Sequence, residues 1–353
     1  METDDSALAP KLAAPQHRPR PLPLFLDMLR RETAGEPERM AGALQGLRAY
    51  QEAPRRPPPE PMPVLVELLG AKLRDYGGQG RPVLFVPSLI NPPNILDLTE
   101  QRSLLRWLSA RGHRVLLLDW GLDSRARSQL TIADHLERIL APMIGTLEEP
   151  PALVGYCLGG TMAVGAAAVT PVRSVATVAA PWHFGGFPDK ARAMLAKLWE
   201  EARPATKALG VLPMEVLQSA FWSLDPNRTV SKFEAFAAMP AGSNEAQAFV
   251  TLEDWANDGP PVSEAAAREL FESFFHEDLT GTGRWKISDQ AVELAALPFP
   301  LFNIVSTADR IVPAASAPCG GDRLELRQGH VGMVVGSRAR EALWEPLDGW
   351  LSR

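Results

Sequence analysis

Short, uninterrupted apolar runs alternate with longer amphipathic stretches from Arg81 onward. Uninterrupted apolar runs are typical of strands that are buried on both faces, as in a parallel sheet. Helical patterns occupy residues 99–111, 131–147 and 158–169 between them. The repetition of strand and helix predicts an α/β fold with a mostly parallel, doubly wound sheet. The predicted strands are Val83–Val86, Val115–Leu118, Ala152–Val154, Val175–Val178 and Leu301–Val305.

The alternation stops between residues 182 and 285, where helical patterns continue without a convincing strand. We interpret this stretch as a helical cap inserted into the sheet domain. The sequence therefore predicts a core of residues 64–181 and 286–353, a cap of residues 182–285, and an N-terminal extension of residues 1–63.

The N-terminal extension has three parts of different composition. Residues 1–22 are rich in proline, alanine and charge, which is typical of disorder. Residues 24–50 have a loose helical periodicity, and the prolines of residues 54–63 predict extended or irregular backbone. We interpret the helical part as a solvated surface helix, with a docking element for a partner or a hydrophobic surface as the alternative.

Length and charge narrow the class of protein. The 353 residues suit one large α/β domain that carries an insertion. The formal net charge is −6 and no run of basic residues is longer than a pair such as Arg55-Arg56, which argues against a nucleic-acid partner. The N-terminus has acidic residues where a secretory signal is basic, so a cytoplasmic protein is expected. The uncharged stretch of residues 150–172 is rich in glycine and predicts a strand, a turn and a helix rather than a membrane span.

The chain has two cysteines, Cys157 and Cys319, which cannot form a disulfide framework in a chain of this length. Their spacing matches no metal site. We therefore expect no metal and no resident cofactor.

Cys157 lies in the motif Gly155-Tyr156-Cys157-Leu158-Gly159-Gly160, between a predicted strand and a predicted helix. This is the nucleophile elbow, G-x-Nuc-x-G, with cysteine in place of serine. The glycines are required because the turn is too sharp for side chains beside the nucleophile. The amides at the start of the helix favour a thiolate and an oxyanion beside it. A buried structural cysteine is the alternative, but the strand–turn–helix context favours a nucleophile.

A thiol nucleophile needs a base, and the base needs an acid that orients it. In α/β hydrolases these residues follow in the order nucleophile, acid, histidine. His330 lies between two glycines beyond the last predicted strand, and Asp309 lies in the loop after Leu301–Val305. Asp322 is a competitor for the acid. Taken alone, a loop aspartate is more often a turn or cap residue, and a single C-terminal histidine is usually structural. The order of Asp309 and His330 along the chain and their positions after strands nevertheless predict a Cys157–Asp309–His330 triad.

The other histidines receive structural interpretations. His17 falls in the predicted disordered segment, and His113 at a helix end. His135 and His276 are assigned to helical surfaces, whereas His183 opens the cap and could line the cleft.

The oxyanion hole requires two backbone amides. Leu158, directly after the nucleophile, is expected to supply one. The loop after Val83–Val86 is expected to supply the other, and Ile90 is our choice.

Cysteine in place of serine indicates the type of chemistry. Transfer of an acyl group from a thioester to cysteine forms another thioester, so the acyl group stays activated for attack by a hydroxyl. This favours acyl transfer from a coenzyme A thioester. Hydrolysis remains open, because water can also attack an acyl-enzyme unless the site excludes it.

Several stretches together resemble the polyhydroxyalkanoate synthases, which polymerise 3-hydroxyacyl-CoA into storage polyester. The resemblance extends from about Arg81 to the end of the chain. It is carried by the early block around residues 89–104, the strand that ends in Leu118-Asp119-Trp120-Gly121, the cysteine elbow, and Asp254-Trp255-Ala256-Asn257-Asp258-Gly259 in the cap.

The resemblance implies an α/β-hydrolase fold and a Cys157 acyl-enzyme, with Asp309 and His330 at the family's catalytic positions. Coenzyme A would be the leaving group and the growing polyester the second substrate. The length of the chain is most similar to that of the class of synthase that works with a second subunit. A homodimer is the other possible arrangement. The resemblance also implies that the protein can act at the surface of a polyester granule. A cysteine-dependent esterase or thioesterase is the alternative function, and a non-catalytic granule or scaffold protein is the third.

Overall fold

The computed structural model describes residues 19–121 and 125–353, in two compact units. The helical unit contains the chain up to Pro57 and Glu215–Asp258, and the α/β unit contains Pro58–Met214 and Gly259–Arg353. The predicted cap is thus divided between the two units. The disorder expected for residues 1–18, and the interpretation of His17, lie outside the described residues.

The α/β unit is built on an eight-stranded sheet in the order β1-β2-β6-β3-β7-β8-β13-β14. All neighbouring strands from β6 to β14 are parallel, whereas β2 is antiparallel to β1 and to β6. The strands are β1 (Val64–Leu68), β2 (Ala71–Asp75), β3 (Pro82–Val86), β6 (Arg114–Asp119), β7 (Ala152–Tyr156), β8 (Ser174–Val178), β13 (Leu301–Ser306) and β14 (Asp322–Leu326). The prediction of a mostly parallel α/β sheet is confirmed.

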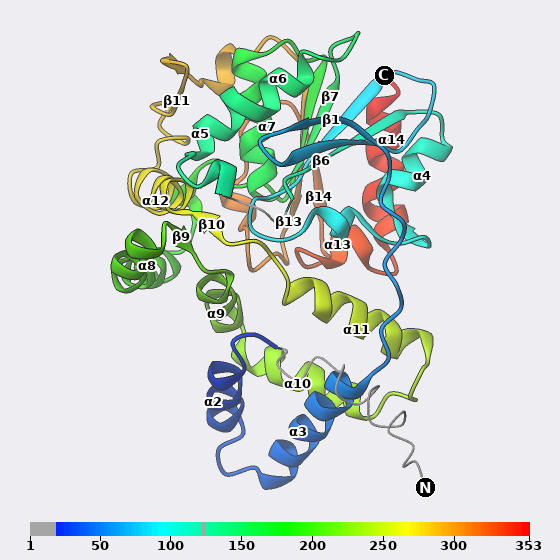
Figure 1. Cartoon of the computed structure of the whole chain (residues 1–353), viewed down its shortest axis with the longest axis vertical. Coiled ribbons are helices and arrows are strands. Elements are labelled where there is room, and N and C mark those ends of the chain that lie inside the picture. Colours follow the sequence, from blue (N-terminus) through cyan, green and yellow to red (C-terminus); the bar gives the residue numbers. More distant parts are fainter. Residues whose placement is uncertain (1–18, 122–124) are drawn as a thin grey trace, which may run out of the picture. The chain divides into compact units, whose positions relative to one another are not determined.

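Helices cover both faces of this sheet. Figure 1 shows α5, α6 and α7 on one face and α4 and α14 on the other. The five predicted strands are present because buried β-branched and leucine side chains fit the space between two helical layers. The helices are α4 (Leu104–Ala110), α5 (Ile132–His135), η4 (Leu136–Leu140), α6 (Ala141–Ile144), α7 (Leu158–Val169), α13 (Gly332–Val335), η9 (Arg340–Trp344) and α14 (Glu345–Leu351).

The helix predicted for residues 99–111 begins later than expected. The chain first forms a short hairpin of β4 (Asp97–Thr99) and β5 (Arg102–Ser103), and the Ser103 side chain then caps α4. Asp97 is buried, and it accepts hydrogen bonds from Arg106 and from the Tyr76 hydroxyl. This network holds the hairpin and overrides the local helical periodicity.

The remaining part of the α/β unit is mainly helical. It contains α8 (Asp189–Leu209), α12 (Glu264–Arg268) and η6 (Glu269–His276). Short strand pairs join β9 (Val211–Leu212) to β10 (Val262–Ser263) and β11 (Lys286–Ile287) to β12 (Gln290–Ala291).

The helical unit has its own apolar core, formed by segments that are far apart in the sequence. Its helices are α2 (Leu22–Glu32), α3 (Pro37–Glu52), α9 (Met214–Leu224), α10 (Pro226–Ala237) and α11 (Asn244–Ala256). Phe25 on α2 contacts Trp222 and Phe233 edge-on, and Tyr50 on α3 contacts Phe233 in the same way. The interpretation of residues 24–50 as one solvated helix was therefore wrong: two helices bury one face against α10. Residues 54–63 have no regular secondary structure, as predicted.

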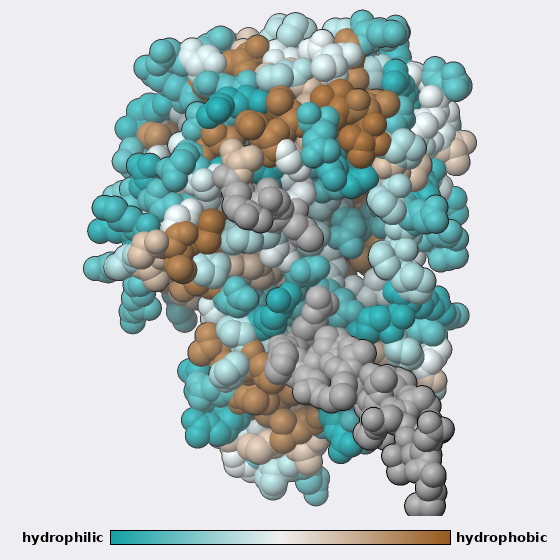
Figure 2. Space-filling view, viewed as in Figure 1, coloured by the Kyte–Doolittle hydropathy of each residue, from teal (hydrophilic) through white to brown (hydrophobic). Residues whose placement is uncertain are grey.

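Part of α2 stays apolar on its outer side. Leu24 and Leu26 are 51% and 38% exposed. Figure 2 shows brown, apolar surface over the region of α2. No described helix combines the length and hydropathy that a membrane crossing requires.

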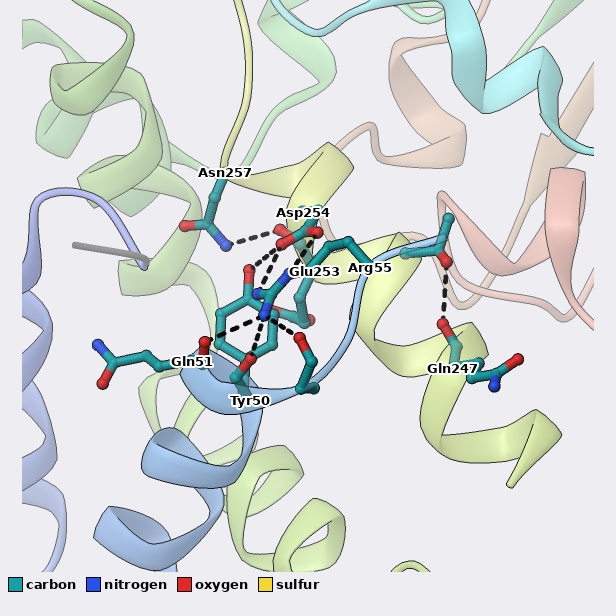
Figure 3. Close-up of polar contacts among 9 residues, drawn as sticks. Tyr50, Gln51, Arg55, Gln247, Glu253, Asp254 and Asn257 are labelled. Carbon is teal, nitrogen blue, oxygen red and sulfur yellow. Dashed lines mark hydrogen bonds and ion pairs between the residues drawn. The ribbon is translucent and has the colours of Figure 1, made fainter. Parts of the chain in front are cut away.

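A polar cluster ties α3 to α11 within the helical unit (Figure 3). Asp254 accepts a hydrogen bond from the Tyr50 hydroxyl at 2.7 Å and pairs with the Arg55 guanidinium at 3.0 Å. Tyr50 is fully buried, and burial followed by the Asp254 charge raises its pKa above the ordinary value. Asp254 belongs to the Trp-containing motif of the sequence, and in the structure it joins the N-terminal helices to that motif.

Candidate active site

Cys157 lies on the sharp turn between β7 and α7. Its backbone has φ 56° and ψ −133°, a conformation that costs free energy for a residue with a side chain. The Cys157 amide donates to the Val178 carbonyl of β8 at 2.9 Å, and this bond holds the turn against the sheet. Cys157 is also the N-cap of α7, and the start of a helix favours negative charge.

The glycines of the elbow are required by close backbone contacts. A Cβ on Gly155 would lie 2.3 Å from the Gly160 Cα, and one on Gly159 would lie 2.0 Å from the Val86 carbonyl oxygen. A Cβ on Gly160 would lie 2.3 Å from the Ala180 side chain. These contacts let α7 approach β3 and β8 closely.

The structure brings the three predicted side chains of the triad together. Asp309 follows β13 and His330 follows β14, so both lie at the carboxyl edge of the sheet with Cys157. The His330 Nδ1 is 2.6 Å from the Asp309 Oδ2, and the His330 ring lies close enough to Cys157 for the charges of the two residues to interact. The second oxygen of Asp309 accepts the amides of Ile311 and Val312 at 2.8 and 3.0 Å.

The surroundings of His330 favour its protonated form. Burial opposes a charge on the ring, but the Cys157 charge and the hydrogen bond of the ring to Asp309 outweigh it and raise the His330 pKa to about 10. The Asp309 side chain is fully buried and that of His330 is 8% exposed. Such a pair can keep a proton on the imidazole while negative charge lies on the sulfur, as a cysteine nucleophile requires.

Sequence reasoning missed two residues that hold the His330 loop. Tyr156 is buried, stacks on the His330 ring at 5.0 Å, and donates from its hydroxyl to the His330 carbonyl at 3.1 Å. Burial, then the Cys157 and Asp309 charges, raise the Tyr156 pKa well above its ordinary value, so the hydroxyl remains a donor. Ser306 donates to the Gln328 carbonyl at 2.5 Å and ties the Asp309 loop to the His330 loop. Tyr156 occupies a variable position of the elbow motif, so the presence of a tyrosine there did not indicate a role in the site.

The predicted oxyanion amides lie in two different environments. Leu158 is the first residue of α7. The Ile90 amide is engaged within its own loop, because it donates to the Ser88 Oγ at 3.1 Å. The role of Ile90 stays a prediction, and an oxyanion would have to share or replace this bond.

The site coincides with the point where the winding of the sheet reverses. From β3 the chain passes to β6 on one side and then to β7 on the other. Ligands in open α/β sheets bind at the carboxyl ends of the strands beside such a reversal. The turn at Cys157 and the loop after β3 both lie there.

The competing residues lie elsewhere. Asp322 is the first residue of β14, at the opposite end of that strand from His330, and it pairs with Arg353 at 2.8 Å. His113 follows α4 and contacts Asp348 at 2.8 Å, and His276 is exposed. His183 is partly buried in the loop after β8. The surface assignment of His135 was wrong, since its ring is 4% exposed.

Comparison with known families agrees with the fold. A family model described as "Alpha/beta hydrolase family" matches residues 83–343. Two solved structures with the same fold are an epoxide hydrolase of Bacillus megaterium and a putative lipase of Sulfolobus solfataricus. The first has a TM-score of 0.53 at 15% identity and covers 82% of this chain and 99% of its own. The second has a TM-score of 0.52 at 13% identity, and it covers 80% of this chain and 89% of its own.

Three curated relatives carry the name "Poly(3-hydroxyalkanoate) polymerase subunit PhaC". The protein of Haloferax mediterranei is 29% identical over 77% of this chain and 58% of its own length. The protein of Haloarcula marismortui is 26% identical over 81% of this chain and 64% of its own length. The protein of Synechocystis sp. is 29% identical over 77% of this chain and 77% of its own length. The chain thus spans less than two thirds of the first two relatives. The resemblance that the motifs indicated is confirmed.

Proposed function

The chain belongs to the alpha/beta hydrolase family, and from this premise we propose that it is an acyltransferase that polymerises 3-hydroxyacyl-CoA into polyhydroxyalkanoate. The observation that carries the proposal is a cysteine, rather than a serine, at the elbow beside a buried Asp309–His330 pair. Relatives named as polyhydroxyalkanoate polymerase subunits support the same substrate class.

The proposed first half-reaction transfers an acyl group to the enzyme. The Cys157 sulfur attacks the thioester carbonyl, and amides including that of Leu158 stabilise the oxyanion. When the carbon–sulfur bond to coenzyme A breaks, the departing thiolate takes the proton of His330. The products are an acyl-Cys157 thioester, free coenzyme A and a neutral imidazole.

The second half-reaction transfers the acyl group to a hydroxyl. Neutral His330, oriented by Asp309, removes the proton of the 3-hydroxyl of an incoming unit while that oxygen attacks the acyl-Cys157 carbonyl. An ester forms, the Cys157 sulfur leaves as thiolate, and the imidazole is again protonated. In this scheme the side chains carry the chemistry and coenzyme A is the leaving group.

The test is product analysis after incubation with 3-hydroxybutyryl-CoA. We expect release of coenzyme A together with polymer, and loss of both in Cys157→Ala. Cys319→Ala is the matched control, because Cys319 is an exposed free cysteine, and it should retain both activities. Release of coenzyme A with free acid as the sole product would replace the polymerase by a thioesterase at the same site.

We further propose that a second polypeptide takes part in the active enzyme and that it works at a polyester granule. The word "subunit" in the names of the relatives supports the first part. Polymerisation by the purified chain alone, at a rate that does not change when extract from its native host is added, would exclude a required second subunit.

A further inference from the structure

Trp120 has no part in the scheme above, although it lies directly after β6, at the same edge of the sheet as Cys157. Its side chain is 3% exposed. Its indole Nε1 donates to the Pro87 carbonyl at 3.0 Å. Pro87 is the first residue after β3, and it opens the loop of Ser88, Leu89 and Ile90 in which the second oxyanion amide is expected. The indole N–H is the single hydrogen-bond donor of the Trp120 side chain, and it bonds to the backbone of this loop. A buried aromatic residue with such a bond is suited to fix the position of the loop.

The Trp120 ring is itself held in place. The His135 ring meets it edge-on at a centroid distance of 5.5 Å. Buried Arg127 donates to the Trp120 carbonyl. Leu89 of the same loop lines one small pocket together with Trp120, Arg127 and His135, so these side chains lie close to the loop. Trp120 therefore has little freedom to follow a displaced loop.

Backbone contacts restrict the same loop from two other directions. Gly159 packs so closely that a Cβ there would lie 2.6 Å from the Pro87 carbonyl carbon. Gly259 approaches from another segment, where a Cβ would lie 2.7 Å from the Ile90 carbonyl oxygen. The loop is thus set between α7 and Gly259, and the Trp120 hydrogen bond fixes it at its first residue.

We propose that Trp120 is a positioning residue that holds the amides of the 88–90 loop where the oxyanion develops, through its bond to the Pro87 carbonyl. The inference rests on the proposed acyl transfer at Cys157. Oxyanion donors are effective over a narrow range of distance, and removal of one donor typically lowers turnover by about 10²–10³-fold. A loop that shifts without unfolding should lose part of that effect.

The test is Trp120→Phe, which keeps an aromatic ring and removes the donor. We expect the rate of Cys157 acylation, measured in a single turnover, to fall roughly 10–100-fold, with KM changed by less than about threefold. Alkylation of Cys157 by iodoacetamide should keep its rate and its pH profile, because displacement of iodide creates no oxyanion. A merely structural defect would lower both reactions.

Two further variants serve as a control and as an independent displacement of the same loop. Trp199→Phe also removes a buried indole donor, which bonds to Glu272 at 2.9 Å, and it should acylate at the wild-type rate. Gly259→Ala pushes on the Ile90 carbonyl from the other direction, and it should again slow acylation but not alkylation. Unchanged acylation in Trp120→Phe, or an equal loss of alkylation, would overturn the inference.

The choice of acyl donor separates this inference from the proposed function. Single turnovers use both 3-hydroxybutyryl-CoA and an activated nitrophenyl ester. If the wild type gives free acid instead of polymer, the polymerase proposal fails while the Trp120 effect can still be measured. If neither donor acylates Cys157, both proposals fail.

Discussion

Two carboxylates, one in each unit, accept hydrogen bonds from side chains of different chemistry. Asp309 in the α/β unit pairs with His330, a side chain that titrates and that also contacts Cys157. Asp254 in the helical unit pairs with the Arg55 guanidinium and with the Tyr50 hydroxyl, whose pKa is raised above its ordinary value. Both carboxylates accept several hydrogen bonds, so the number of bonds does not distinguish them.

The difference lies in what the partner can still do. The His330 ring has one nitrogen on Asp309 and lies close enough to Cys157 to interact with its charge, so a proton on this ring can take part in chemistry at the sulfur. The proton of the Tyr50 hydroxyl stays between Tyr50 and Asp254 in a partly buried contact. The first arrangement suits chemistry and the second suits the joining of two helices. Catalytic potential therefore follows from a titratable partner that faces a nucleophile, rather than from a well-bonded acid.

The largest expected difference comes from matched changes of the two acids. Asp309→Asn should lower acyl transfer roughly 10⁴-fold, because the amide no longer favours the imidazolium and holds the wrong tautomer. Asp254→Asn removes the same charge from a cluster whose partners Tyr50 and Arg55 lie in the helical unit, and acyl transfer should stay within about threefold. Coenzyme A release measures both.

Urea unfolding supplies the converse measurement for these variants. Asp254→Asn should lose roughly 1–3 kcal/mol of stability, since it weakens charge-assisted bonds to Tyr50 and Arg55. If Asp254→Asn reduced acyl transfer as strongly as Asp309→Asn at equal foldedness, the distinction between the two acids would be wrong.

A second buried histidine sharpens the comparison through its pH dependence. Burial lowers the His135 pKa to about 4; its bond to the Thr131 carbonyl and the nearby Asp134 oppose this, and Arg127 adds to it. Between about pH 4 and the ordinary value of 6.5, the unfolded chain therefore binds a proton that the folded protein lacks. This contribution to stability is present above pH 6.5 and is lost as the pH falls toward 4, by at most about 1.4 kcal/mol per pH unit.

The measurement is urea unfolding as a function of pH. His135→Phe keeps the contact with Trp120 and should flatten the decline, whereas His276→Gln changes an exposed histidine and should match the wild type. An unaltered slope in His135→Phe would show that other groups cause the acid sensitivity.

The α/β unit could be predicted from the sequence where its signals are local. The buried strands have continuous apolar runs, and the elbow motif specifies its own turn, so α7 begins and ends at the predicted residues. β14 was not predicted because Asp322, Arg323 and Glu325 are exposed at the sheet edge and interrupt the apolar pattern. Tyr156 and Trp120 could not be assigned roles, since their partners, the His330 and Pro87 carbonyls, are backbone atoms distant in the sequence.

The helical unit could not be predicted from the sequence, for the same physical reason. The face of α2 and α3 that holds Phe25 and Tyr50 is covered by Phe233 of α10. No local pattern indicates a partner so far along the chain. A periodic apolar face shows that a helix is amphipathic, but not what covers it.

The smallest expected effect tests the Tyr50 contact alone. Tyr50→Phe keeps the ring that packs on Phe233 and removes the hydroxyl that donates to Asp254 at 2.7 Å. Because only this one bond of Asp254 is lost and its pair with Arg55 remains, urea unfolding should show a loss of about 0.5–1.5 kcal/mol, with acyl transfer unchanged. Arg48→Ala changes an exposed pair with Glu52 on the same helix and should leave the urea midpoint unchanged. An equal loss in the two variants would mean that the contact with Asp254 adds no more than a surface pair, and the structural role given to Asp254 would then rest on Arg55 alone.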